Sequence, residues 1–169
     1  MKLKQLLSLI KSAAFCLLLG VNTFVHANLF DDENKESILI EANRQAMDLT
    51  NNTLTFYENV KVEQGGMTLL AEQLDVVRNK AEQTELLIAQ GAPASFSHKL
   101  ETGEVVTAES SNITFNVNTR ILTLVGDAKI AQADSQITGD KIEYDVKQRK
   151  LVASSEKNQS RVRTVLTPN

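Results

Sequence analysis

Apolar and polar residues alternate along most of the 169-residue chain from residue 38 onward. At 38–43, for example, Ile, Ile and Ala occupy every second position, with Leu, Glu and Asn between them. A period of two is typical of a β-strand that buries one face. The chain is therefore predicted to be an all-β protein of short antiparallel strands. The later apolar positions of this pattern include Leu54, Phe56, Val60, Val62, Met67, Leu69, Leu74, Val76, Ala92, Ala94, Phe96, Ile113, Phe115, Val117, Leu122, Leu124, Ala128, Ile130, Ile142, Tyr144, Val146, Leu151 and Ala153.

Short polar or glycine-containing segments interrupt the alternation, and we expect them to separate the strands. They are "TNN" at 50–52, "QGG" at 64–66, and "GD" at 126–127 and again at 139–140. The sole plausible helical stretch is "NKAEQTELL" at 79–87, which could equally be a polar loop followed by the start of a strand.

The chain contains an internal repeat. "ENVKVEQ" at 58–64 resembles "GDAKIAQ" at 126–132, and the longer segment 41–56 aligns with 138–153. Weaker copies are found at 69–77 and 106–115, and each copy is interpreted as strand, tight turn, strand. One such unit cannot bury its apolar face alone, so the copies must stack. We therefore expect a jelly roll or solenoid of stacked antiparallel strands with apolar residues facing an interior groove, and a closed β-sandwich is the alternative.

The first 27 residues have the layout of a secretory signal. Three lysines precede an apolar run at 13–24, and Val25-His26-Ala27 places small residues at the −3 and −1 positions of a cleavage site. We predict a signal peptide over 1–27, cleaved between Ala27 and Asn28, and a single secreted domain over 28–169. A membrane anchor is the alternative interpretation. The whole chain has a net charge of −3, which argues against general nucleic-acid binding.

Candidate catalytic chemistry is sparse. After the signal region His98 is the single histidine and there is no cysteine. We interpret His98 as a surface residue in a loop, because no second histidine or cysteine could share a metal with it. No glycine-rich phosphate loop and no Gly-x-Ser-x-Gly motif occurs. The acidic residues have no spacing that favours glycoside cleavage over simple solvation. We therefore predict no enzymatic activity, no metal and no cofactor.

The alternating apolar residues would line the inside of the sheet assembly. If the sheets pack closely these residues form a core, and if the sheets stay apart they form an apolar trough that could hold acyl chains. Each methylene moved out of water contributes about 0.8 kcal/mol. The predicted lining residues of this lipid-binding groove are Ile38, Ile40, Phe56, Leu69, Phe96, Phe115, Val117, Leu124, Ile142 and Tyr144.

The two ends of the predicted sheet differ in charge. Residues 31–41 hold five acidic side chains and one lysine, whereas residues 145–169 hold six basic side chains against two acidic ones. Unpaired first and last strands recruit further strands, so we expect head-to-tail self-association steered by these charges. The basic end could instead meet lipid phosphates or simply be solvated. The predicted edge residues are Ile38, Ile40, Arg161, Arg163 and Val165.

Several long segments together resemble the OstA-like family of lipopolysaccharide export proteins. They are "ILIEANRQAMDLTNNTLTFYENVKVEQGGMTLLAEQL", "GAPASF", "LTLVGDAKIAQADSQITGDKIEYDVKQRKLVA" and "RVRTVLTP", which with the signal region span nearly the whole chain. The resemblance implies a twisted, open β-jellyroll whose groove holds the acyl chains of lipid A.

The resemblance also implies partners. Copies of such a protein would stack head-to-tail into a bridge between inner-membrane LptC and the N-terminal domain of outer-membrane LptD, both of which share the fold. Two alternatives remain open: a structural β-solenoid with no ligand, and a related family member such as the periplasmic domain of LptC. Compared with the family pattern the sequence ends early, at Pro168-Asn169.

Overall fold

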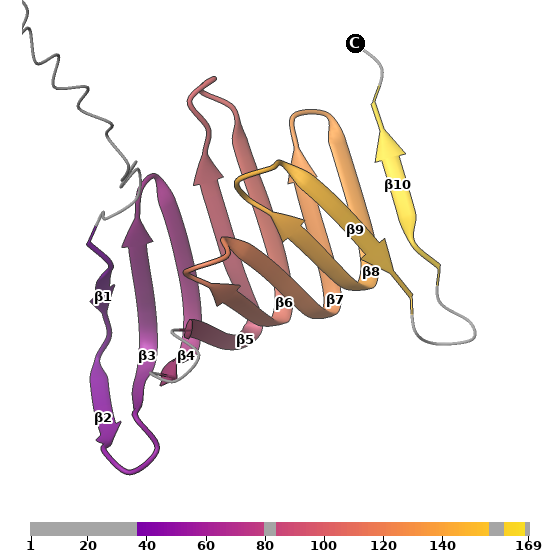
Figure 1. The fold of residues 1–169 in the computed structure, drawn as a ribbon. Helices are drawn as coiled ribbons and strands as arrows, with labels where there is room; N and C mark the ends of the chain where they lie inside the picture. The colour runs from indigo at the N-terminus through magenta and orange to yellow at the C-terminus, as the bar shows by residue number, and fades with distance from the viewer. Residues whose placement is uncertain (1–36, 80–83, 156–160, 168–169) are drawn as a thin grey trace, which may run out of the picture. The chain divides into compact units, whose positions relative to one another are not determined.

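The computed structural model describes residues 37–79, 84–155 and 161–167, which form one antiparallel sheet of ten strands (Figure 1). The predicted signal peptide and its cleavage site lie outside these residues. No helix in the described part of the chain is long and apolar enough to cross a membrane. The strands are β1 (Leu39–Glu41), β2 (Arg44–Asp48), β3 (Thr53–Gln64), β4 (Met67–Asn79), β5 (Thr84–Lys99), β6 (Val105–Asn116), β7 (Ile121–Gln132), β8 (Ser135–Asp145), β9 (Lys150–Ser154) and β10 (Arg163–Leu166).

The six strands β3 to β8 are long, and each pairs with the next along the chain. At one end of the sheet β1 and β2 pair with the two halves of β3. At the other end β10 and β9 pair with the two halves of β8, as Figure 1 shows. The sheet therefore has two halves: the β1 wall, which runs from β1 to β10, and the β2 wall, which runs from β2 to β9.

The two walls meet along a line of irregularities in the strand pairing. The register shifts between Tyr57 and Val60 in β3, and between Val125 and Ala128 in β7, with matching shifts in the strands between them. Such bulges bend a strand and increase its twist. Each long strand thus passes from one wall to the other without ending.

The repeated motif provides two of these bends. Glu58 and Asn59 have φ of 66° and 52°, and Gly126 and Asp127 have φ of 81° and 51°. The prediction that "GD" at 126–127 and 139–140 separates strands is therefore wrong, because both pairs lie inside strands β7 and β8. A pair of left-handed residues can bulge a strand as well as end it. The weaker copies at 69–77 and 106–115 also lie inside single strands and contain no turn.

The longer repeat does consist of strand, turn and strand. After β2, the Asp48 carboxylate accepts hydrogen bonds from the backbone N–H groups of Thr50 (2.8 Å) and Asn51 (3.1 Å). These bonds, those from Asn51 above all, lower the pKa of Asp48. At the corresponding place after β8, Asp145 accepts from the N–H of Gln148 (2.7 Å). The turn predicted at 50–52 is confirmed, whereas in the ambiguous stretch 79–87 a strand starts at Thr84 and residues 80–83 lie outside the described chain.

The alternation places one face of each wall in a common hydrophobic cluster, and its best-buried members have exposures of 0–2%. Among the described strands, neither β1 nor β2 pairs with β9 or β10, so the sheet does not close. The predicted all-β, open β-jellyroll is confirmed. The most deeply buried large apolar side chains are Leu74, Ile113, Leu122, Leu124, Ile142, Val60 and Val106.

Candidate functional site

The inward faces of the two walls hold the residues predicted to line a groove. Seven of the ten are buried: Phe56, Leu69, Phe96, Phe115, Leu124, Ile142 and Tyr144. The other three, Ile38, Ile40 and Val117, are half-buried and pack against that cluster. The structure therefore brings all ten together on one apolar interior. That these side chains contact a lipid stays a prediction.

The interior opens into a cavity at the end of the sheet formed by β1 and β2. This cavity has a volume of about 610 Å³, which falls within the range of sites that hold small ligands. Its apolar lining comes from both edge strands and from β3, β4 and β5, and consists of Ile38, Ile40, Met47, Leu54, Val76 and Leu87. The apolar interior is therefore accessible at this end.

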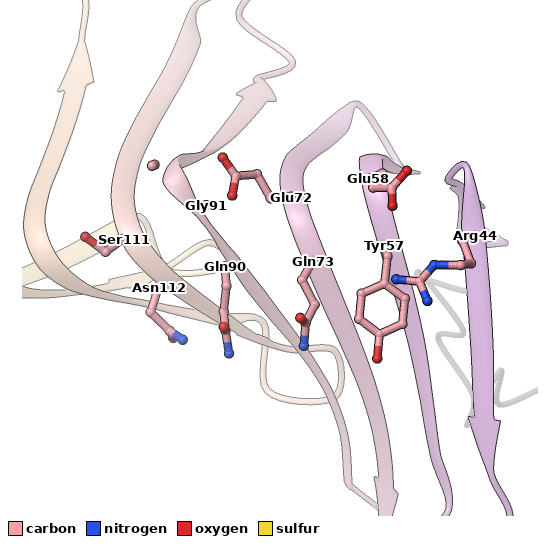
Figure 2. Close-up of a pocket in the computed structure, with 10 residues that line it drawn as sticks. Arg44, Tyr57, Glu58, Glu72, Gln73, Gln90, Gly91, Ser111 and Asn112 are labelled. Carbon is pink, nitrogen blue, oxygen red and sulfur yellow. The ribbon is translucent and has the colours of Figure 1, made fainter.

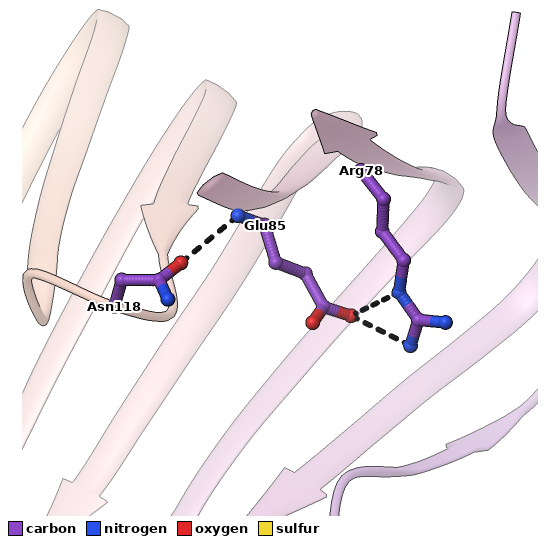
Figure 3. Close-up of polar contacts among 3 residues, drawn as sticks. All are labelled: Arg78, Glu85 and Asn118. Atoms are coloured by element: carbon purple, nitrogen blue, oxygen red, sulfur yellow. Dashed lines mark hydrogen bonds and ion pairs between the residues drawn. The ribbon is translucent and has the colours of Figure 1, made fainter. Parts of the chain in front are cut away.

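An ion pair lies at the edge of this cavity (Figure 3). Both Nε and Nη2 of Arg78 are 3.0 Å from Oε1 of Glu85, and both residues line the cavity. The backbone N–H of Glu85 donates to Oδ1 of Asn118 (2.9 Å), and the N–H of Asn118 donates to Oδ1 of Asn116 (3.0 Å). These bonds hold the start of β5 against the β6–β7 turn. Because Arg78 is largely exposed, the ion pair itself contributes little to stability.

His98 lies on the inward face of β5 and not in a surface loop, so that interpretation was wrong. It pairs in the sheet with Met67 and Val106, both of which are buried. Burial is the main cause that lowers the pKa of His98, and the positive charges of Arg120 and Arg149 lower it further. Its Nδ1 atom is buried, and within the described part of the chain no hydrogen-bond partner reaches it.

A second cavity, of about 680 Å³, lies on the outward face along the line of bends (Figure 2). The Arg44 guanidinium stacks over the Tyr57 ring, with its Cζ 4.4 Å from the ring centroid. Gln73, Gln90 and Asn112 follow in register on the next three strands, so polar side chains form a row. This polar cavity lies on the face opposite the apolar interior. The sequence contained no pattern that indicated it, because the row comes from strands far apart in the chain.

Both ends of the sheet leave large apolar side chains exposed. At the β1 and β2 end they are Leu39, Met47 and Leu49, and at the β9 and β10 end they are Val152, Val162, Val165 and Leu166. Of the predicted edge residues, Arg161, Arg163 and Val165 are exposed, whereas Ile40 faces inward opposite Val62. Within the described chain the end strands pair on one side only, and such strands with exposed apolar residues favour the addition of another strand.

Among the described residues, no three His, Cys, Asp or Glu side chains gather as metal ligands would. The features that stand out are therefore an apolar interior, an open end and two unpaired sheet edges.

Comparisons with known proteins agree with this geometry. The profile of a family described as LptA/(LptD N-terminal domain) LPS transport protein matches residues 39–150. The lipopolysaccharide export system protein LptA of Haemophilus influenzae is 34% identical over 143 residues, covering 83% of this chain and 82% of that protein. LptA of Escherichia coli strain K12 is 36% identical over 138 residues, covering 81% of this chain and 74% of that protein.

A solved structure has the same fold. LptH of Pseudomonas aeruginosa, described as the LptA homologous periplasmic component of the lipopolysaccharide transport device, matches with a TM-score of 0.72. The match covers 80% of this chain and 98% of the LptH chain at 21% sequence identity. At that identity the likeness supports the fold alone, and the predicted resemblance to OstA-like proteins is confirmed by the family profile and the LptA relatives.

Proposed function

We propose, from the premise that this chain belongs to the LPS transport family of LptA and the LptD N-terminal domain, that it carries lipopolysaccharide through the periplasm. The acyl chains of lipid A would lie in the apolar interior between the two walls. The observation that supports this best is the apolar cavity of about 610 Å³ at the β1 and β2 end, which adjoins the buried cluster.

The chemistry of the interior suits acyl chains. Each methylene of an acyl chain that leaves water contributes about 0.8 kcal/mol. Side chains such as Leu54 and Leu87 can surround the acyl chain in place of neighbouring lipids. In this structure side chains fill the middle of the interior, where Leu74, Leu122 and Ile142 have no exposed surface. A lipid that occupied the whole interior would therefore require the walls to move apart, starting at the open end.

The end strands, which pair on one side only within the described chain, support a bridging role. A strand added to β1 or β2 from one partner, and to β9 or β10 from another, would extend the sheet and keep the interiors in line. We propose head-to-tail association of this chain with itself and with LptC and the N-terminal domain of LptD. The chain would then span the space between the inner and outer membranes. A nucleotide-driven partner would have to supply the direction of transport.

A structural β-solenoid without a ligand is the second candidate, and the dense packing in the middle of the interior favours it. Mass spectrometry of lipids that co-purify with the protein from a periplasmic extract distinguishes the two. Lipopolysaccharide in the purified protein supports transport, and protein that never contains or binds it supports the structural role.

A matched pair of variants tests whether lipopolysaccharide binds at the end of the sheet formed by β1 and β2. Ile40 faces the cavity, whereas its neighbour Leu39 is exposed on the other face of β1. Ile40→Asp should weaken lipopolysaccharide binding because a carboxylate beside acyl chains lacks a partner. Leu39→Asp introduces the same charge on the outward face and should bind normally. Equal binding by both variants would contradict the proposed position of the lipid.

The proposed compartment has its own test. The periplasmic location rests on the signal peptide predicted over 1–27, which lies outside the described residues. Protein isolated from the periplasm should begin at Asn28. N-terminal sequencing that finds Met1 instead would contradict the secreted form.

A further inference from the structure

The two walls approach each other at a rim where their loops meet, and a guanidinium spans the gap there. Arg120 belongs to the β6–β7 turn of the β2 wall, with φ of 62°. Its N–H donates to the carbonyl of Asn116 (2.8 Å), and its own carbonyl accepts from the N–H of Val146 (3.0 Å). The position of its backbone is thus fixed from two sides.

The Arg120 side chain points across to the β1 wall. Its Nη2 lies 3.7 Å from Sδ of Met67 on β4, and its Cζ lies 5.7 Å from the centroid of the Phe115 ring. Met67 and Phe115 are both buried. The cation therefore lies directly against the apolar interior, in contact with a thioether that is a weak hydrogen-bond acceptor and an aromatic face that attracts cations.

A second arginine belongs to the adjoining turn, because the N–H of Val146 at the start of the β8–β9 turn donates to the Arg120 carbonyl. Arg149, in the turn between β8 and β9, is exposed and has φ of 54°. After burial, the charges of Arg120 and Arg149 are the causes that lower the pKa of His98. Arg149 also acts on Tyr144, whose pKa is raised mainly by burial while the Arg149 charge opposes the rise. Two arginines from separate turns of the β2 wall thus influence one imidazole on the β1 wall.

The local balance of charge favours an anion. Two guanidinium groups act on the half-buried His98 imidazole, whose buried Nδ1 has no partner within the described part of the chain. The carboxylate that also acts on Tyr144 is Asp145, and it accepts a hydrogen bond from the N–H of Gln148 in its own turn. Guanidinium groups bind phosphate through paired, charge-assisted hydrogen bonds. The negative charge of a phosphate favours the protonated form of a neighbouring imidazole, and in either protonation state an imidazole N–H can donate a hydrogen bond to a phosphate oxygen.

We propose that His98, Arg120 and Arg149 form a phosphate-binding site at the rim of the apolar interior, and that it takes a phosphate group of the lipid whose acyl chains the interior holds. We call these three residues the rim site. The inference rests on the proposed function, because it identifies the part of the same ligand that this rim recognises. Two turns that β7 and β8 separate in the sequence, and a strand of the opposite wall, all contribute.

The position of the rim site favours a lipid phosphate over free phosphate. The cations stand beside Met67 and Phe115, so a bound molecule with both a phosphate and acyl chains satisfies both surfaces at once. Such a phosphate would add a charge-assisted bond to the contact that the Arg120 guanidinium makes with the thioether. Charge-assisted bonds to phosphate are stronger than bonds to a weak sulfur acceptor.

Binding measurements on the full chain test this site. The probes are lipid A with both phosphates, the same lipid after removal of its phosphates, and inorganic phosphate. Arg120→Gln and Arg149→Gln should each weaken binding of the phosphorylated lipid by about tenfold or more. Both variants should bind the dephosphorylated lipid as the unsubstituted protein does. Arg44→Gln, which removes the same charge from the outward face, is the matched control and should bind both lipids normally.

The ring resonances of His98 provide a readout of binding that does not depend on the overall stability of the protein. The ring resonances of His98, identified by their loss in His98→Gln, should shift when phosphorylated lipid is added and shift much less with dephosphorylated lipid. The proposal is overturned if the arginine variants weaken both lipids equally, if Arg44→Gln weakens binding as much, or if His98 does not respond. Saturable binding of inorganic phosphate with the same His98 shift, at concentrations comparable to those needed for the lipid, would identify an ion site and overturn the lipid assignment.

Failure of the rim site is distinguishable from failure of the proposed function. If dephosphorylated and phosphorylated lipids bind equally well to every protein, the interior holds acyl chains and the rim site is wrong. If neither lipid binds the unsubstituted protein, the proposed function is wrong as well.

Discussion

The backbone of Gly126 lies so close to Ser111 that a Cβ at Gly126 would be 3.2 Å from both the Cβ and the Oγ of Ser111. Gly126 is the first residue of the bend in β7, and its φ of 81° is one that L-amino acids rarely adopt. Ser111 lies at the corresponding bend of β6, between the residues where that pairing shifts register. The bends of neighbouring strands are thus packed against each other, which keeps them in one line where the two walls meet.

Gly126→Ala should therefore destabilise the protein by about 1–3 kcal/mol, because it adds backbone strain and a tight contact. Gly103→Ala is the matched control: Gly103 has φ of 87°, but a Cβ there would have no atom of the described residues within 4 Å. Denaturant unfolding of both variants measures the difference, which reports the contact with Ser111 separately from the strain. Equal losses of unfolding free energy would show that close packing of the bends contributes nothing.

Phe115 is expected to contact the lipid. Its side chain is 4% exposed and faces the interior, whereas Thr114 next to it faces the other side of β6. A photo-crosslinking residue at 115 should label lipopolysaccharide and one at 114 should not, because neighbours in a strand point to opposite faces. Asn116 has the same parity as Thr114 but is a poor control, since its Oδ1 holds the N–H groups of Asn118 and Thr119. Equal labelling at 114 and 115 would refute the assignment of the inward face.

Phe115→Asp tests the same position without a crosslinker. A carboxylate without a partner in the apolar interior should weaken lipid binding. It could also unfold the domain, so circular dichroism must accompany the binding measurement. Loss of binding with an unchanged spectrum supports contact with the lipid, and unchanged binding contradicts it.

The pH dependence of stability should reveal His98. Burial and the nearby arginines lower its pKa below the ordinary value of 6.5. The unfolded chain therefore takes up a proton on His98 at a higher pH than the folded protein does. The stability that His98 contributes is fully present above pH 6.5 and is lost as the pH falls from there through the folded pKa.

Denaturant unfolding at several pH values between 7 and 5 measures this loss. His98→Gln should remove that part of the pH dependence while leaving the dependence at lower pH, where the carboxylates titrate. An identical slope in the variant would show that His98 is not responsible. Arg120→Gln should raise the pKa of His98, which a titration of the His98 ring resonances reports.

The alternation of the sequence was sufficient to identify the interior. A buried strand face requires a period of two whatever the order of strands, so positions such as Phe96 and Leu124 could be assigned before the fold was known. The repeat was also real, but its meaning at 126–127 was not recognisable. A glycine followed by aspartate is typical of a turn between strands, and here neighbouring strands hold it inside one strand as a bulge.

The rim site could not be predicted from the sequence. Arg120 and Arg149 each look like ordinary solvated turn residues, and His98 like a surface residue. Their approach depends on the bends, which turn the ends of the two walls toward each other and bring the Arg120 guanidinium to Met67 across 53 residues of sequence. No local pattern reports a contact of that kind.

Strand addition at β10 depends on backbone groups that face away from β8. Thr167 donates its N–H to the carbonyl of Asp134 (3.0 Å), and Val165 lies opposite Gln136 in the same register. Because hydrogen-bonding direction alternates along an antiparallel strand, the N–H of Thr164 should point away from the sheet. Thr164→Pro should then remove a donor for the incoming strand and spare the pairing with β8.

Sedimentation velocity over a range of protein concentrations measures this effect. Thr164→Pro should shift self-association to higher concentration, while Thr164→Ala, which also lacks the hydroxyl but keeps the N–H, should associate normally. If the two variants associate alike, the outward edge of β10 does not pair with another chain.

Charge at the basic end should steer the same association. Arg163 is the first residue of β10, Arg161 lies just before it, and both are exposed. Residues 31–41, which end with β1, hold five acidic side chains and one lysine. Salt screens interactions between exposed charges, with a Debye length of about 10 Å at 0.1 M. Oligomers should therefore weaken as salt rises, and weaken further when Arg161 and Arg163 are both changed to Glu.

Light scattering after size-exclusion chromatography at low and high salt tests this prediction. Arg44→Glu is the control, because it makes the same type of substitution at a single position on β2, at the opposite end of the sheet, where added negative charge should not repel the basic end of a neighbouring copy. Oligomers that respond to neither salt nor the paired Arg substitutions would leave strand addition intact and remove its electrostatic part. A chain that stays monomeric at high concentration and low salt would refute self-association itself, because both edges would then be unable to recruit a second copy.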